Sequence, residues 1–390
     1  MLNKATNPVS PAQPVEENTT QDPNRRFNEH AVAWLRLIGS PGIGPVTARQ
    51  LVTACGGICE IWKKTTAELA EIEGVGRKAI QAIADTAPDA AMDIMQQCAE
   101  LGIDILCLDD KAYPAALRQC DDAPPVLFAR GQLRSLGHTR LLAVVGARKA
   151  DSEARLLTRR WSRALAMQGV GIVSGMAYGI DAAAHGGALE AASAPTIAVL
   201  GCGLAAPLSP VQEKQIAAIG ENGCVVSEFL PQEEARPEHF PRRNRIIAGM
   251  TAATLVVQAD LRSGSLITAR LAAGYGREVL TVPGSVLAGR HAGCHQLLRD
   301  GATLAESPED ILRQMHWQGG EKSARPDYAP ASEQEAAILQ ALGEEIMHID
   351  AMAEHCALTV PELSPILLGL ELIGVVESLP GSRYTLGRGD

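Results

Sequence analysis

Three short segments of the chain combine glycine with serine or arginine, the composition of an anion-binding loop. Glycine lets backbone N–H groups approach a ligand closely, and serine and arginine add directed hydrogen-bond donors. Where a helix begins directly after such a loop, its N-terminus carries partial positive charge and favours phosphate. We therefore expect a phosphate-binding site built from residues 146–149, 174–181 and 262–266.

A fourth segment reads FPRRNRII and places three arginines and an asparagine within four positions. Side chains this close in sequence cannot all point away from one another. Some of them can tie the domain together through carboxylates such as Glu228, and we expect this role for Asn244 and Arg245. Arg242 and Arg243 are the better candidates for contact with a ligand.

Two groups of residues resemble enzyme sites. Ser174, Asp181 and His185 are the residue types of a catalytic triad, but the last two are four positions apart on an expected helix, which equally suits a local pair. A second group offers metal-type ligands without an evident fourth: His291, Cys294 and His295. The chain contains no Gly-Lys dipeptide and therefore no Walker phosphate loop. We expect a protein that is not an enzyme and holds neither metal nor cofactor.

Charge is distributed unevenly along the chain. The net charge is −10 and the isoelectric point about 5.5, which excludes a general attraction of the whole molecule to nucleic acid. Residues 140–163 nevertheless carry +5 and residues 236–270 carry +4, whereas residues 333–390 carry −8. Any site for a polyanion must therefore be local. Three arginines of the first basic segment are four residues apart on one expected helix, which fits either a ligand-binding face or a solvated one: Arg155, Arg159 and Arg163.

The middle of the chain, about residues 106–315, alternates short apolar runs with helix-length segments. The runs are rich in Val, Ile and Leu with little polar alternation, as in strands buried on both faces. They are 126–129, 141–145, 171–173, 196–200, 224–227, 254–258 and 279–282, and the expected helices include 152–168, 182–192 and 266–277. This pattern predicts an α/β class domain with a doubly wound, Rossmann-like sheet, whose ligands bind outside the carboxyl ends of the strands.

Two smaller domains are expected on either side of this Rossmann-like domain. Residues 29–105 read as short helices with two similar Gly-hydrophobic-Gly turns, at Gly42 and Gly74, which resemble a tandem helix-hairpin-helix (SAM-like) module. The turns suit contact with a DNA backbone or simple helix packing. Residues 332–390 read as three helices and a hairpin, the order of a winged helix. The third of these helices is acidic and lacks a base, which favours a protein partner or a packing role over DNA.

The remaining segments bear on location. Residues 1–28 are polar and aperiodic, which predicts a disordered tail, and residues 316–331 look like a linker. The first residues lack the apolar core of a secretory signal, and no apolar run reaches the roughly 18 residues that a membrane span needs. The nine cysteines are odd in number and scattered. We expect a cytoplasmic protein with free thiols and no membrane contact.

Several of these motifs together resemble the DNA-processing protein A family, also called DprA or Smf. The resemblance spans most of residues 106–315 and rests on VGARKA at 145–150, SGMAYGIDAAAHGGAL at 174–189, FPRRNRIIAGM at 240–250, SGSLITARLA at 263–272 and GREVLTVPGS at 276–285. It implies a homodimeric protein that binds single-stranded DNA in natural transformation, protects it and loads the RecA recombinase onto it. Longer members of the family also carry helix-hairpin-helix and winged-helix modules.

The resemblance, carried over by position onto the loops above, also names candidate DNA-binding residues. Tyr178 and Phe240 are included as the aromatic side chains best placed to stack on a base. Where a glutamate often ends the later strand in the family, this chain has Gln258, which leaves the local field more positive. The candidates are Arg148, Lys149, Ser174, Gly175, Tyr178, Gly179, Asp181, Phe240, Arg242, Arg243, Asn244, Arg245, Ser263, Gly264, Ser265 and Thr268.

An enzyme of the same fold is the alternative hypothesis. A nucleotide-binding or phosphoribosyl hydrolase could use the same loops on a single nucleotide. Basic residues spread over several loops favour an extended polyanion, and the lack of a convincing acid–base pair disfavours catalysis. Binding that depends on the length of the nucleic acid would distinguish the two.

Overall fold

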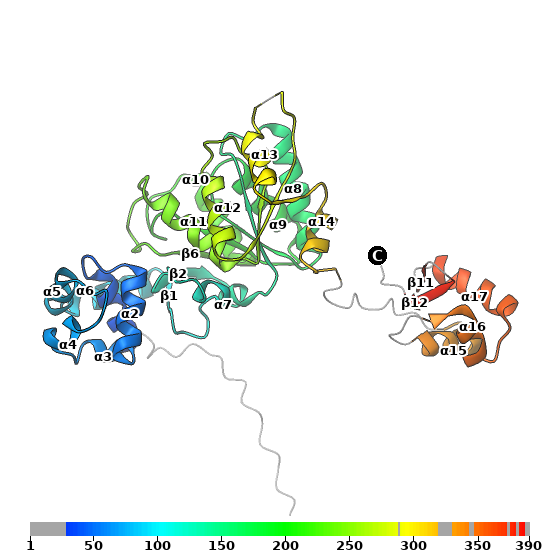
Figure 1. The fold of residues 1–390 in the computed structure, drawn as a ribbon, viewed down its shortest axis with the longest axis horizontal. Coiled ribbons are helices and arrows are strands. Elements are labelled where there is room, and N and C mark those ends of the chain that lie inside the picture. The colour runs from blue at the N-terminus through cyan, green and yellow to red at the C-terminus, as the bar shows by residue number, and fades with distance from the viewer. Residues whose placement is uncertain are drawn as a thin grey trace, which may run out of the picture. The chain divides into compact units, whose positions relative to one another are not determined.

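The computed structural model describes residues 29–287, 289–318, 330–342, 347–372, 375–379 and 382–386. The predicted tail at 1–28 lies outside the described residues, as does most of the predicted linker at 316–331. The chain divides into two compact units, the first ending at Pro308 and the second beginning at Glu309 (Figure 1).

The first unit begins with a helical module. Its two glycine turns repeat each other in conformation, because Gly42 and Gly74 both adopt φ = +83° and each is followed two residues later by a glycine that caps a helix. The predicted internal repeat is therefore present in the backbone. The helices are α1 (Glu29–Gly39), α2 (Pro45–Cys55), α3 (Ile58–Ile61), α4 (Thr66–Ala70), α5 (Arg77–Asp85) and α6 (Asp89–Glu100).

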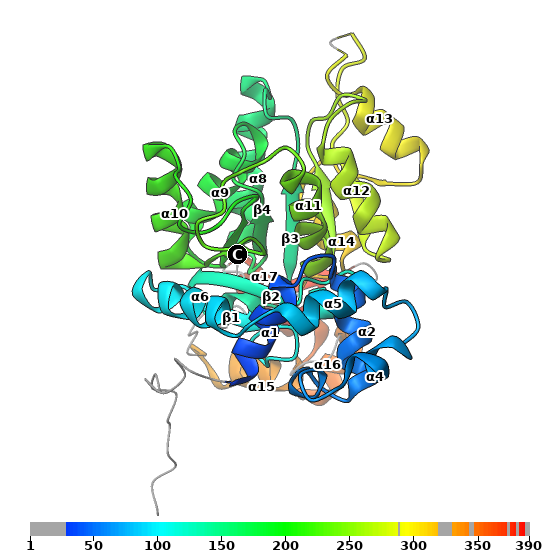
Figure 2. The same ribbon diagram turned by 90° about the vertical axis from the view of Figure 1, so that its left-hand side faces the viewer.

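This helical module shares a hydrophobic core with the domain that follows it. Trp34 of α1 is buried, and its indole N–H donates to Asp109 Oδ1 at 3.0 Å. Arg49 of α2 donates to the carbonyl oxygens of Arg118 and Cys120 at 2.9 and 2.7 Å. Figure 2 shows α1 and α6 beside the nearest strands of the sheet. The module is thus fixed against the rest of the first unit by both apolar and polar contacts.

A nine-stranded sheet forms the centre of the first unit as the structure describes it. Its order is β1-β2-β6-β5-β4-β3-β7-β8-β9, parallel from β6 to β9, with β1 and β2 antiparallel at one edge. The seven predicted strands are confirmed, and the sequence analysis missed β1 and β9. The strands are β1 (Asp104–Cys107), β2 (Val126–Gly131), β3 (Leu141–Val145), β4 (Gly171–Ser174), β5 (Thr196–Val199), β6 (Cys224–Ser227), β7 (Ala253–Val256), β8 (Glu278–Thr281) and β9 (Thr303–Leu304).

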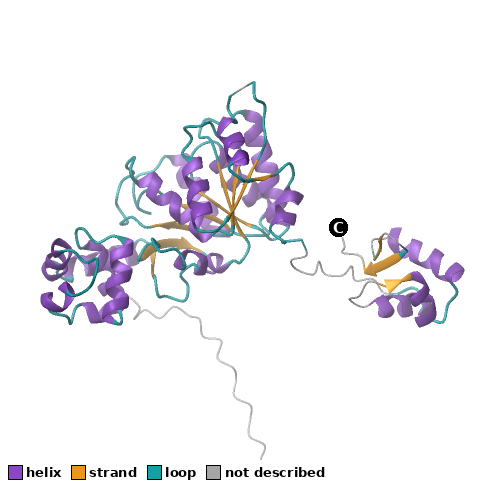
Figure 3. Cartoon of the chain, in the orientation of Figure 1, coloured by secondary structure: helices purple, strands orange, loops and turns teal. Residues whose placement is uncertain are grey.

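Helices cover both faces of this sheet, whose strands lie between them in Figure 3. Local signals set where they start: the Asp151 carboxylate accepts from Ala154 N at 2.8 Å, and Ser209 forms a capping box with Gln212. The predicted Rossmann-like arrangement is confirmed. The helices are α7 (Ala115–Arg118), α8 (Ser152–Met167), α9 (Ile180–Ala191), α10 (Pro210–Asn222), α11 (His239–Met250), α12 (Ser265–Gly274) and α13 (Ala292–Arg299).

Strand β3 is the point at which the order of strands reverses. Leu142 of β3 pairs with Ile172 of β4 on one side and with Ala253 of β7 on the other. The chain therefore builds β3 to β6 in one direction and β7 to β9 in the other. The loops that follow β3 and β7 therefore run to opposite sides, and a crevice forms between them. In sheets of this kind the ligand binds in that crevice.

The second unit is a winged helix, as predicted. Its three-stranded sheet has the order β10-β12-β11, and its core includes Ile338, Met352 and Leu367. Glu362, one of the acidic residues of the third helix, accepts from Thr359 N at 2.8 Å and so caps its own helix. The elements are α15 (Glu333–Leu342), β10 (Met347–His348), α16 (Ile349–His355), α17 (Val360–Leu372), β11 (Val376–Leu379) and β12 (Arg383–Leu386), preceded by α14 (Pro308–Gln314).

No helix among the described residues is long and apolar enough to cross a membrane.

A neutral histidine is buried where α9 packs against the sheet. His185 is fully buried in α9, and its Nδ1 lies 2.7 Å from Thr196 Oγ1. The threonine hydroxyl itself donates to Ile172 O at 3.0 Å, so Nδ1–H is the donor to Thr196. Burial, assisted by the positive charge of Arg243, lowers the pKa of His185 to about 3 from an ordinary 6.5.

This histidine makes stability depend on pH. Below pH 6.5 His185 becomes protonated in the unfolded chain but stays neutral in the folded chain. Protonation therefore favours the unfolded state, and the free energy of unfolding falls as pH falls below 6.5. Between pH 7 and pH 5 the free energy of unfolding should fall by about 2 kcal/mol more in the wild type than in His185→Gln. Urea unfolding followed by tryptophan fluorescence measures both differences, and equal pH dependence in the two proteins would contradict the assignment.

Candidate anion-binding cleft

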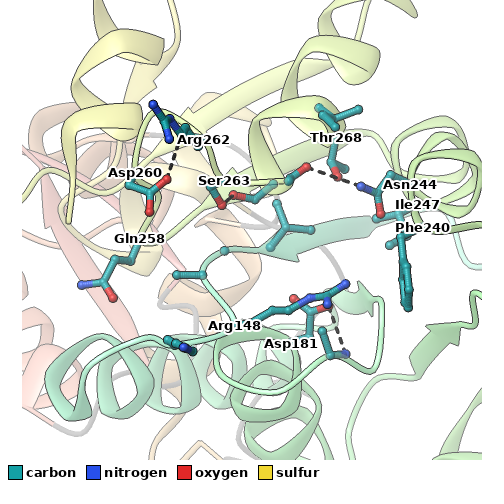
Figure 4. A pocket seen from close by; sticks show the side chains of 18 of the residues that line it. Arg148, Asp181, Phe240, Asn244, Ile247, Gln258, Asp260, Arg262, Ser263 and Thr268 are labelled. Atoms are coloured by element: carbon teal, nitrogen blue, oxygen red, sulfur yellow. Dashed lines mark hydrogen bonds between the residues drawn. The ribbon is translucent and has the colours of Figure 1, made fainter. Parts of the chain in front are cut away.

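A cleft of about 710 Å³ opens at the carboxyl ends of β3 and β7, at the reversal of strand order (Figure 4). Its walls come from the loop after β3, the start of α9, the first turns of α11, the loop after β7 and the loop after β8. Ten of the predicted site residues line it: Arg148, Lys149, Asp181, Phe240, Arg243, Asn244, Ser263, Gly264, Ser265 and Thr268.

An exposed cation marks one side of the cleft. The guanidinium carbon of Arg148 lies 4.6 Å from the centre of the Phe240 ring, a cation–π contact that orients the arginine. Phe240 is half-buried. The side chain of the next residue, Lys149, is also exposed. Two positive charges therefore project from the loop after β3 without a carboxylate partner among the described residues.

Gly179 holds that loop in place. It adopts φ = +82°, and a Cβ there would overlap the carbonyl oxygens of Ala147 and Arg148. The next amide, Ile180 N–H, donates to Ala147 O at 3.4 Å. Only glycine allows the loop after β4 to approach the loop after β3 this closely. The position of Arg148 thus depends on backbone packing as well as on its aromatic partner.

A second arginine lies inside the domain. Arg243 is 4% exposed, and its Nη1 donates to the carbonyl oxygens of Gly175 and Val199, the latter at 2.6 Å. Asp181 nearby accepts from the amides of Gly175 and Ala177 at 3.2 and 3.3 Å. Burial raises the pKa of Asp181 and lowers that of Arg243, and the opposite charge of each opposes the shift of the other. Arg243 therefore joins α11 to the loop after β4 and to the last residue of β5.

The opposite wall is polar and includes the beginning of α12. The hydroxyl oxygens of Ser263 and Ser265 are 2.8 Å apart, and Asn244 Nδ2 donates to Gly264 O at 3.4 Å. The N-terminus of this helix has no side-chain cap and carries partial positive charge, while the amides of Leu266 and Ile267 donate to Ser263 O and Gly264 O. Hydroxyl groups beside a helix N-terminus are suitable donors to a phosphate oxygen or a base edge.

Gln258 closes the floor beside β7. Its Nε2 donates to Asp151 Oδ2 at 2.7 Å and to His291 Nε2 at 3.2 Å. The sequence analysis noted Gln258 but did not include it among the site residues. It also missed Asp260 and Arg290, and it included Arg262 in a predicted anion-binding loop without naming it as a DNA-binding residue. Asp260 and Arg262 follow a predicted strand and could have been found from that position.

Six predicted residues lie outside the lining. Arg245 pairs with the Glu228 carboxylate, which confirms the expected structural contact, and Arg242 lies 3.3 Å from the same carboxylate. Tyr178 is 64% exposed beside the cleft. The others are the last residue of β4, Ser174, and two glycines of the loop after it, Gly175 and Gly179.

The members of the two enzyme-like groups are engaged with protein partners. Ser174 is fully buried and its Oγ donates to Val144 O at 2.7 Å, and the same hydroxyl interacts with Asp181, where it opposes the rise in the pKa of that carboxyl. Asp181 and His185 are likewise engaged with backbone amides and Thr196. The three metal-type residues have separate partners, since His295 contacts Gly284 O and His291 contacts Gln258, while Cys294 faces Val257 O. The cleft has the chemistry of a binding site for an anion.

Sequence comparison identifies the family of the domain that forms this cleft. The family described as DNA recombination-mediator protein A matches residues 104–316, more than half of the chain and all of the cleft. The chain belongs to this family. The resemblance to DprA and Smf is thus confirmed, and two further matches agree with the flanking modules: a SAM-like helix-hairpin-helix tandem at 35–89 and a DprA winged helix domain at 322–382.

Relatives of the DNA recombination-mediator protein A family resemble this chain over most of their length. Protein Smf of Escherichia coli is 39% identical over 289 residues, which cover 72% of this chain and 76% of the relative. Protein Smf of Synechocystis is 31% identical, over 92% of this chain and 99% of its own. The crystal structure of DNA processing protein A from Streptococcus pneumoniae matches with a TM-score of 0.65 at 31% identity, over 73% of this chain and 97% of its own.

We expect Arg243 to be required for stability and Arg242 to be dispensable. Arg243→Ala leaves two buried carbonyls and Asp181 without their cation, at a cost of about 3–5 kcal/mol, and Arg243→Lys should lie between it and the wild type. Arg242→Ala removes an exposed partner of Glu228, at a cost of roughly 1 kcal/mol or less. Urea unfolding compares the three variants. Equal losses for Arg242→Ala and Arg243→Ala would contradict the structural role of Arg243.

Proposed function

We propose that the chain binds single-stranded DNA in this cleft and acts as a binding protein without covalent chemistry. The observation that carries the proposal is the set of exposed cations around a cleft that also offers serine hydroxyls and the N-terminus of α12. They come from three different loops: Arg148, Lys149, Arg262 and Arg290. The solved structure of DNA processing protein A from Helicobacter pylori, which concerns the single-stranded DNA binding mode of that protein, supports the ligand class. It matches with a TM-score of 0.50 at 27% identity, over 55% of this chain and 95% of its own.

The side chains divide into contact and positioning roles. We assign phosphate contacts to the exposed cations and polar contacts to Asn244, Ser263, Ser265 and Thr268. The guanidinium plane of Arg148, stacked on Phe240, and the exposed ring of Tyr178 are the surfaces on which a base can stack. The remaining predicted residues act through the shape of the loops, because they do not line the cleft or are hydrogen-bonded to protein partners: Ser174, Gly175, Gly179, Asp181, Arg242, Arg243 and Arg245.

The family resemblance supports a more specific role. We propose that this role is in natural transformation, with protection of the incoming strand and loading of RecA, by a cytoplasmic homodimer. The absence of a free acid–base pair in the cleft favours this binding role over the alternative of a nucleotide hydrolase, since Asp181 and His185 are both buried. The acidic winged-helix unit fits a protein partner better than a polyanion.

The length of the ligand tests the proposal. Fluorescence anisotropy with labelled oligothymidylates of about 2 to 20 nucleotides should show affinity that rises with length, because more phosphates and bases are engaged. Thymidine monophosphate should compete poorly. A mononucleotide that binds as tightly as the longest strand would instead indicate the alternative, a nucleotide-handling enzyme.

Replacement of Arg148 should weaken binding to all sequences alike. Its guanidinium is exposed at the cleft and contacts the backbone in the proposed complex, so Arg148→Ala should make the salt dependence of log K shallower by about 0.7, the value of one phosphate on a single strand. The control is Arg134→Ala, which removes an exposed arginine of the same domain outside the cleft. An unchanged salt slope in folded Arg148→Ala would leave Arg148 with a structural role only.

A further inference from the structure

A basic helix leads away from the proposed DNA cleft. The loop that carries Arg148 and Lys149 continues directly into α8, whose N-terminal cap is Asp151. The helix has 16 residues and, at 1.5 Å per residue, is about 24 Å long. Helices that connect parallel strands run opposite to them, so α8 extends from the cleft edge of the sheet towards the other edge. This length could accommodate several nucleotides of a single strand.

One face of α8 is both exposed and positively charged. At 100° per residue, its exposed positions occupy one side of the helix, whereas Ala154, Thr158 and Ser162 are buried on the other. Glu153 in the first turn is the acidic residue of this helix. The exposed side carries four arginines: Arg155, Arg159, Arg160 and Arg163.

These four arginines differ in their contacts with other groups of the protein. Arg159 pairs with Glu190 of α9, and Arg155 Nε donates to Asp151 O at 3.3 Å. Arg160 and Arg163 make no hydrogen bond or ion pair within the described part of the chain, and Arg163 lies close enough to Glu190 for its charge to help lower the pKa of that carboxyl. Two cations therefore stay available on the surface of a helix that is itself held against α9. Surfaces that serve only solubility usually carry interspersed charges of both signs, whereas the free charges on this face are all positive.

We propose that the exposed face of α8 binds the phosphates of the same single strand after it leaves the cleft. This inference rests on the proposed function and extends its site from the cleft to a second, sequence-independent track. The occupant follows from charge and continuity: the free cations match a polyanion, and the track begins at the loop whose Arg148 and Lys149 face the cleft. Backbone contacts of this kind neutralise phosphates and release counterions.

The experiment compares short and long strands in the full chain. The test variant is Arg160→Gln/Arg163→Gln, and the matched control is Arg134→Gln/Lys214→Gln, which removes two exposed charges elsewhere in the same domain. Anisotropy is measured with oligothymidylates of about 3 and about 20 nucleotides over a series of salt concentrations. The short strand fits the cleft alone, whereas the long strand can also reach α8.

The test variant should bind the short strand as the wild type does and the long strand roughly tenfold or more weakly at low salt. Its salt slope for the long strand should be shallower by about 1.4, which corresponds to two phosphates. The control should match the wild type on both strands. Wild-type affinity and slope for the long strand in the test variant would overturn the track, and so would an equal loss on both strands. If the wild type bound neither strand, the proposed function itself would fail.

Discussion

The buried guanidinium of Arg243 is the interaction on which the cleft depends. Moving a charge out of water is costly, and it is tolerated here because Gly175 O and Val199 O accept from it and Asp181 lies close by. The groups that satisfy this one cation belong to the loop after β4, the last residue of β5 and the start of α9. Each of these segments is thereby fixed relative to α11, which supplies a wall of the cleft. A neutral residue of the same volume could fill the space but could not hold these segments together.

The cleft uses arginine in two different ways. Arg243 donates its hydrogen bonds to protein groups. Arg148 lies near the same Phe240 ring but is exposed, and it donates to no group among the residues that the structure describes. The interior arginine sets the shape, and the surface arginine supplies charge that can be exchanged for counterions. This division explains how an acidic protein can present a local positive surface without a basic overall composition.

The sequence predicted the sheet better than it predicted the side chains of the cleft. Strands such as 141–145 are continuous apolar runs buried on both faces, which gives an unambiguous signal, whereas β9 has only two residues and no such run. Within FPRRNRII, Arg242 and Arg243 looked equivalent. They lie on a helix, where neighbouring residues point about 100° apart, so one faces solvent and the other the core. Arg290 comes from a loop without a distinctive composition, and only the folded sheet brings it to the cleft.

The pairing of β3 with β7 also constrains how the protein is made. Leu142 lies opposite Ala253, so one side of the central strand has no neighbour until more than a hundred further residues have been synthesised. During that interval a fully apolar strand has an open edge, the feature that invites pairing with other chains. The wall that follows β7 can join the wall that follows β3 only after this pairing forms. The nascent chain therefore has an exposed strand edge for as long as its binding site is incomplete.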